Sequence, residues 1–97
     1  MANVNIIFDG VLDDVDIFFV PDEIIERIET IGHEFLTWVP FATSDDYWKI
    51  INGKKCVIAE TDGFIQWLNS TYCKKTKKAF VVKEHVQYSP AYKSIEF

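Results

Sequence analysis

The stretch Asp22–Val39 constrains the fold of this chain most, because its apolar and charged residues separate at helical spacing. The apolar positions recur every three or four residues, which is typical of a helix with one buried face: Ile24, Ile28, Ile31, Phe35 and Trp38. The opposite arc is polar, and half of its residues are glutamates. We therefore expect one long helix that packs its apolar face on the rest of the chain. Gly32, on the apolar side, indicates a close approach to a sheet.

Prolines mark both ends of this helix. Asp22 follows Pro21 and has the side chain of an N-cap residue, which accepts a hydrogen bond from a free amide of the first turn. Pro40 lacks an amide hydrogen and so ends the helix.

The remaining apolar runs alternate or are rich in β-branched and aromatic residues, which predicts strands. We expect these strands at Asn3–Phe8, Val11–Val20, Ala79–Tyr88 and Ala91–Phe97, the second of them best formed from Val15 to Val20. Turn residues predict a hairpin from the first two strands, through Asp9-Gly10, and a last hairpin from the other two, through Ser89-Pro90. In the strand at 79–88, Phe80, Val82, Val86 and Tyr88 should share an apolar face in which Glu84 is the one polar member.

Two further segments complete the expected fold. Asn52-Gly53 predicts a two-residue hairpin that pairs Trp48 with Val57. A short helix over residues 44–53, ending at the glycine, remains an alternative. A second helix should begin at Thr61, with an inner face that contains Phe64, Ile65 and Leu68.

These elements predict a single domain over residues 1–97 of the α+β class. We expect a single antiparallel sheet of about five to six strands, with one long and one short helix packed on it.

Charge divides unevenly between the two halves of the chain. Residues 1–48 hold 11 acids and one base, a net charge of −10, whereas residues 49–97 hold nine lysines and four acids, a net charge of +5. Two interpretations remain open: a solvated surface that is simply lopsided, or an acidic patch that attracts a basic partner.

The sequence also predicts where the protein works. No apolar run approaches the roughly 18 residues of a membrane span, and the first residues lack the pattern of a secretory signal. Cys56 and Cys73 are 17 positions apart and belong to no metal or redox motif, so we expect free thiols in a reducing cytoplasm. A monomer or weak dimer is expected.

The sequence does not contain the groups that catalysis requires. His33 and His85 both fall on solvated faces, and neither has a nucleophile at a recognisable spacing. Asp13, Asp14 and Asp16 lack the further ligands of a calcium loop. We therefore predict no enzyme activity, no metal and no cofactor. A reactive thiol at Cys73, beside several lysines, is the minor alternative.

Two surface features remain as candidate binding sites. Lys74–Lys78, next to Tyr72, has the composition of a small nucleic-acid contact, although lysines in a loop also simply keep it solvated. Acids mixed with aromatics in the first half suit a protein interface. The candidate partner-binding residues are Asp13, Asp14, Asp16, Glu23, Glu26, Glu29, Asp45, Asp46, Tyr47 and Trp48.

In size, acidity and lack of catalytic motifs, the chain resembles the immunity proteins of bacterial toxin systems, especially those of contact-dependent growth inhibition. The resemblance implies binding to one cognate toxin domain, often a basic nuclease, and obstruction of its active site. The expected function is therefore a toxin inhibitor, and the alternative is a nucleic-acid-binding module that uses Lys74–Lys78.

Overall fold

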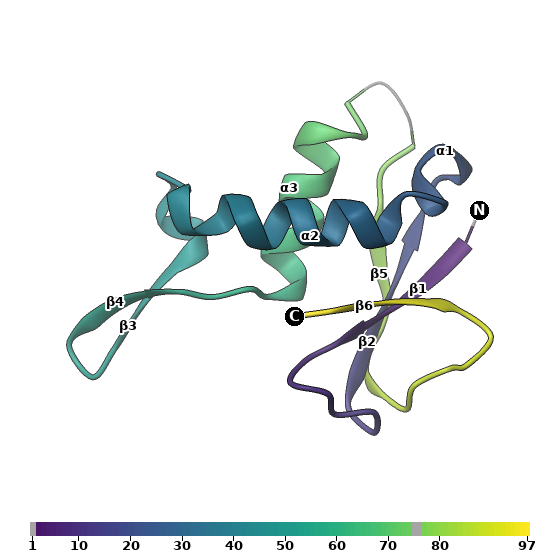
Figure 1. The fold of residues 1–97 in the computed structure, drawn as a ribbon, viewed down its shortest axis with the longest axis horizontal. Helices are drawn as coiled ribbons and strands as arrows, with labels where there is room; N and C mark the ends of the chain where they lie inside the picture. Colours follow the sequence, from purple (N-terminus) through teal and green to yellow (C-terminus); the bar gives the residue numbers. More distant parts are fainter. Residues whose placement is uncertain (1, 75–76) are drawn as a thin grey trace.

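Two helices cover one face of a four-stranded sheet in the computed structural model, which describes residues 2–74 and 77–97 (Figure 1). The sheet has the strand order β5-β2-β1-β6, and its strands are β1 (Ala2–Ile7), β2 (Val15–Val20), β5 (Phe80–Val86) and β6 (Lys93–Glu96). The helices are α1 (Asp22–Ile25), α2 (Ile28–Trp38) and α3 (Thr61–Thr71). Short 3₁₀ turns, η1 (Val39–Phe41) and η2 (Asp45–Tyr47), lead to the hairpin of β3 (Trp48–Ile51) and β4 (Lys54–Val57).

The expected α+β class is confirmed, but the expected single antiparallel sheet is matched only in part. Strands β3 and β4 form a two-stranded sheet of their own, and Figure 1 shows this hairpin extending away from the main sheet. Within the main sheet, β1 and β2 are antiparallel, whereas β1 and β6 are parallel.

The central helix buries the face that its periodicity predicted. Ile28, Ile31 and Phe35 are fully buried. The helix is divided, because the amide of Arg27 bonds to the carbonyl of Ile24 in a tighter turn that separates α1 from α2. The predicted Asp22 cap was wrong, since the residue in the N-cap position is Pro21 and no side chain caps this end. Trp38 is more than one-third exposed.

Gly32 lies where α2 packs closely on β6. A Cβ atom at this position would lie 3.3 Å from Cγ2 of Ile95 in β6, which is tighter than an ordinary contact. The expected close approach to a sheet is therefore confirmed, and glycine is used here for space.

Phe35 is the centre of the hydrophobic core. Its ring lies 5.3–6.3 Å, between centroids, from five other aromatic rings: Trp38, Tyr47, Phe64, Trp67 and Phe97. Figure 1 shows α2 crossing α3 in this region. One side chain thus holds α2 against α3, the base of the hairpin and the last residue of the chain.

The hairpin at residues 48–57 is confirmed in the predicted register, with Trp48 opposite Val57. Asn52 and Gly53 both have positive φ, 53° and 77°, as a tight two-residue turn of this kind requires. The alternative of a short helix over 44–53 is therefore wrong, apart from the single 3₁₀ turn at Asp45–Tyr47.

The predicted last hairpin was wrong, because β6 does not return beside β5. Residues 87–92 cross to the opposite edge of the sheet, where β6 joins β1. Tyr88 and Tyr92 pack on a second buried cluster of Ile7, Val15 and Ile17. The crossing segment therefore covers the face of the sheet that bears no helix.

Buried Asn5 fastens this crossing segment. Its Nδ2 donates to the carbonyl of Ser89 at 2.9 Å, and its Oδ1 accepts from the amide of Ser89 at 3.1 Å. A single side chain thus satisfies a backbone donor and a backbone acceptor of the half-buried Ser89.

The apolar face predicted for the strand at 79–88 is also only partly present. Phe80 and Val82 are exposed, and the ring of Phe80 stacks on that of Phe19, its partner in β2. Beyond Val81, the pairing of β2 with β5 shifts register on both sides of Ile17. The irregular register changes which side chains of β5 face inward. In α3, the inner face contains Phe64, Trp67 and Leu68, whereas Ile65 is only half-buried.

Replacing Phe35 with alanine should lower the free energy of unfolding by about 3–5 kcal/mol, because it removes a ring buried among five others. Chemical denaturation would measure this loss. Phe41→Ala is the matched control, since Phe41 is 79% exposed and its removal should cost little. Similar losses for the two variants would contradict the packing described here.

Replacing Asn5 with alanine should cost about 1–3 kcal/mol, because the amide and carbonyl of Ser89 lose their buried partners. Amide hydrogen exchange should also quicken across residues 87–92. Asn3→Ala, at the half-buried start of β1, is the control and should change neither quantity much.

Candidate functional site

Carboxylates from separate parts of the chain gather at one end of the sheet, where β1 and β6 end and β2 and α3 begin. We name this surface the acidic end and define it by the carboxylates that line it, together with Asp13, the exposed neighbour of Asp14 in the chain. Its residues are Asp9, Asp13, Asp14, Asp16, Glu60, Asp62 and Glu84. Two adjoining depressions of about 260 and 320 Å³ lie within it, and Phe8, Thr61 and His85 complete their walls. The acidic end thus combines loop, helix and strand residues.

Asp16 holds the acidic end together. One oxygen of its carboxylate accepts from the hydroxyl of Thr61 at 2.5 Å, and the other accepts from the amide of His85 at 3.1 Å. These bonds join β2 to the first residue of α3 and to the irregular part of β5. Both carboxylate oxygens of Asp16 are thus used in bonds within the fold, so Asp16 is a poor candidate for partner contact.

His85 lies at the centre of these carboxylates. Its backbone has a φ of 56°, a conformation that is uncommon for residues other than glycine. Its Nδ1 lies 2.9 Å from Oδ1 of Asp14, and its side chain is 79% exposed. The hydrogen bond with Asp14, and then the charges of Asp14, Asp16 and Glu84, raise the pKa of His85 above its ordinary value of 6.5.

The chemistry available at the acidic end is attraction of cationic groups. A catalytic triad needs a nucleophile bonded to the histidine, whereas the recorded side-chain bond of His85 goes to Asp14, and Thr61 bonds to Asp16. Among residues 2–74 and 77–97, no group of three or more His, Cys, Asp or Glu side chains is arranged to hold a metal ion. Exposed carboxylates of this density suit lysine and arginine side chains.

The ten candidate residues from the sequence do not form one surface. Asp13, Asp14 and Asp16 lie at the acidic end, whereas the three glutamates Glu23, Glu26 and Glu29 lie on the exposed side of α1 and α2 or at the turn between them. Asp45, Asp46, Tyr47 and Trp48 lie at the base of the hairpin, and the side chain of Asp46 lies outside the described part of the structure.

Two of these candidates are poor surface contacts. Tyr47 is 7% exposed and packs on Phe35 and Trp38, so its ring is part of the hydrophobic core. Trp48 is half-buried, and its Nε1 donates to the carbonyl of Ala42 at 2.9 Å. The role of Tyr47 as an interface aromatic is therefore corrected, since its ring already has partners inside the fold.

Sequence reasoning missed five members of this neighbourhood: Asp9, Glu60, Asp62, Glu84 and His85. Most of them belong to the lysine-rich half of the chain, and only the folding of β5 and α3 against β2 brings them to Asp14 and Asp16. A signal did exist in the sequence. Glu84 interrupts an otherwise apolar alternation, and a lone charge in such a strand marks a place where the face is not buried.

The basic loop offers less support for a site. Lys78 donates to the carbonyl of Cys73, while Lys75 and Thr76 lie outside the described residues. Cys56 and Cys73 are both free, as expected, but Cys73 is fully buried. The alternative of a reactive thiol at Cys73 is therefore wrong, because the sulfur has no access to solvent.

The raised pKa of His85 gives a prediction with a definite sign. In an NMR titration, His85 should titrate above 6.5, and Asp14→Asn should lower its pKa. Because the folded state binds this proton more tightly, the contribution to stability is fully present at pH below the unfolded value. It is lost as pH rises through the folded pKa. Asp13→Asn is the control, and an equal effect from it would contradict the assigned pair.

Comparison with protein-family models, curated proteins and solved structures found no match to this chain. Within the described residues, no helix is both long and apolar enough to cross a bilayer. We therefore infer function from the charges and contacts of the chain itself.

Proposed function

We propose that this chain is a stoichiometric inhibitor of a basic protein, and specifically an immunity protein that neutralises a toxin domain of the nuclease type. The observation that carries the proposal is the acidic end, in which exposed Asp9, Asp13, Asp14, Asp62 and Glu84 surround a structural Asp16. No nucleophile bonded to His85 accompanies them among the described side chains. Binding, rather than turnover, is the role that these groups suit.

Long-range attraction is the first contribution of this surface. The chain has a net charge of −5, and the carboxylates of the acidic end add a local field of the same sign. A field of this kind speeds diffusional encounter with a basic partner and orients it before contact. Lys49 of the hairpin pairs with Glu60, so part of the negative charge of the acidic end is offset within the chain.

Active-site obstruction is the second contribution. A nuclease holds phosphates with lysine, arginine or protonated histidine, and carboxylates form charge-assisted hydrogen bonds with the same groups. When such a nuclease is docked on the acidic end, the carboxylates of this chain would occupy its phosphate-binding groups. The nucleic-acid substrate of the nuclease would then be excluded. Phe8 and Val11, which line one of the depressions, offer apolar contact beside the charges.

The test is the association rate with the native partner, recovered from the source organism and identified by mass spectrometry. Reversal of two exposed acids, Asp13→Lys with Glu84→Lys, should slow association by about tenfold or more at low salt. The effect should shrink as salt rises, since exposed charges are screened. These two residues are chosen because neither makes the bonds that hold Asp16 in place.

The matched control reverses the same number of charges on the outer side of the helices, Glu23→Lys with Glu26→Lys. This variant should bind with a smaller loss of rate and should still inhibit the partner. Equal losses for both pairs would assign the effect to net charge alone. A partner that proves to be RNA or DNA, or a purified toxin that the wild-type chain fails to inhibit, would contradict the proposal.

A further inference from the structure

The outer edge of β6 has no neighbouring strand within the described part of the chain. The amide of Phe97 bonds to the carbonyl of Ile7, and the carbonyl of Phe97 accepts from the amide of Asp9, so position 97 faces β1. Because backbone groups of successive strand residues point to opposite sides, Ile95 also faces β1, whereas Ser94 and Glu96 face outward. Among the described strands, β6 pairs only with β1.

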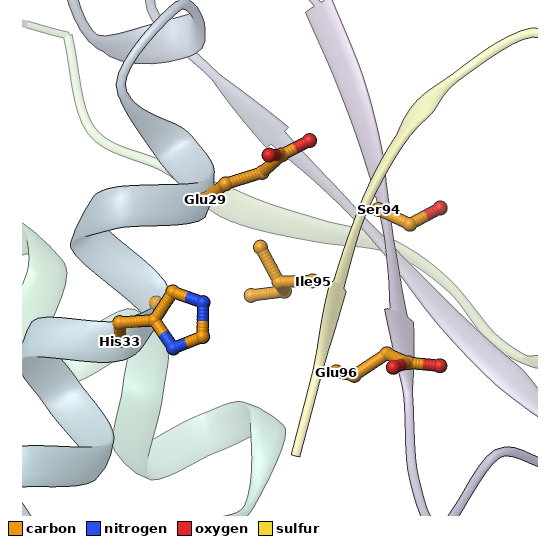
Figure 2. Close-up of a pocket in the computed structure, with 6 residues that line it drawn as sticks. Glu29, His33, Ser94, Ile95 and Glu96 are labelled. Carbon is orange, nitrogen blue, oxygen red and sulfur yellow. The ribbon is translucent and has the colours of Figure 1, made fainter.

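A groove runs along this edge, between β6 and α2. Its cavity of about 210 Å³ is lined by Glu29, Gly32, His33, Ser94, Ile95 and Glu96. Figure 2 shows Ile95 pointing toward the helix, Glu29 and His33 on the helix side, and Ser94 and Glu96 pointing the other way. The missing side chain of Gly32 brings the helix down to Ile95 and gives the groove an apolar floor.

We propose that this groove takes an extended basic segment of the partner, which adds to the sheet as a further strand beside β6. The backbone of Ser94 and Glu96 would supply the hydrogen bonds of strand addition. Lysine or arginine side chains of the segment would alternate between Glu29, on the face of α2, and Glu96, on the opposite face. That the segment belongs to a toxin rests on the proposed function. That the groove binds an extended basic segment does not rest on it.

The other exposed edges fit such a segment less well. The edge of β5 is irregular, with register shifts and the positive φ of His85, and irregular edges resist pairing. The β3–β4 hairpin bears Lys49, Lys54 and Lys55, which repel a basic strand. Among the described strands, the β6 edge combines regular outward backbone groups with a carboxylate on each face, Glu29 and Glu96. Its one cation, Lys93, is the first residue of the strand and does not line the groove.

A second copy of this chain is the competing occupant. Symmetric pairing of two β6 edges would put both α2 helices on the same face of the joined sheet. Each helix carries Glu29 at the groove, so like charges would meet across the join. The charge of the groove therefore favours a basic segment over self-association.

The first test uses a synthetic probe, an acetylated and amidated peptide in which lysine alternates with threonine and valine. Titrated into the isotope-labelled chain at low salt, it should shift the amide resonances of Ser94, Glu96 and His33. A peptide of the same composition that is N-methylated at alternate residues should bind at least tenfold more weakly, because strand addition needs those amides. Shifts confined to other surfaces, or none at millimolar peptide, would overturn the proposal.

The second test blocks the edge. Glu96→Pro removes an outward amide without touching the bonds to β1, a position at which an edge strand tolerates proline. It should weaken the peptide at least tenfold, while thermal melting confirms the fold. If Glu96→Pro does not fold, Glu29→Lys with Glu96→Lys serves instead, with Glu23→Lys and Glu26→Lys as the matched control. Equal weakening by the control pair would overturn the proposal.

Binding of the native partner separates this inference from the proposed function. Weaker binding by Glu96→Pro supports strand addition at β6. Unchanged binding by Glu96→Pro, with slower association of Asp13→Lys with Glu84→Lys, would overturn the groove and leave the proposed function standing. Sedimentation could instead show that the chain forms a dimer at high concentration and that Glu96→Pro abolishes this dimer. That result would mean that the edge of β6 binds a second copy of the chain, and it would overturn the proposal.

Discussion

The packing of Phe35 against five aromatic rings is the interaction on which the rest of the structure depends. It fixes α2 relative to α3, and the position of α3 sets where Thr61 meets Asp16. Asp16 in turn places His85 and the irregular end of β5. The geometry of the acidic end thus depends on the packing of the core around Phe35. A substitution of Phe35 would therefore disturb the acidic end as well as lower the stability of the fold.

Local patterns were sufficient to predict much of the fold. The apolar face of α2 and the hairpin at Asn52-Gly53 each follow from a few neighbouring residues, through helical period and turn geometry. Local patterns could not predict which strand β6 pairs with. Ser89-Pro90 indicates a turn, but it does not indicate which edge of the sheet the chain joins after that turn. Asn5 bonds to Ser89 in the segment that leads to β6, a contact between residues 84 positions apart that no local pattern indicates.

From the sequence, only the negative charge of the candidate site was predictable, and not the set of residues that form it. The excess of acids in the first half drew attention to Asp14, which lines the acidic end, and to its neighbour Asp13. It also drew attention to residues that the fold distributes over other faces, and to Tyr47, which the core absorbs. Glu84 was noticed as a polar residue in an apolar strand but was not chosen as a site residue, because linear charge counting placed it among lysines. Antiparallel pairing of β5 with β2 brings it to the acidic end. Surfaces that combine distant segments need the sheet order, which composition does not contain.

The central claim is that a basic protein docks on the acidic end and along the adjoining edge of β6. Hydrogen–deuterium exchange of the chain, free and saturated with its native partner, tests that claim most directly. The account predicts slower exchange in residues 9–14, at Glu84 and His85, in the first turn of α3 and in β6, with little change at the tip of the β3–β4 hairpin. Protection concentrated on α1, the outer side of α2 or the hairpin, with none at the acidic end, would contradict it.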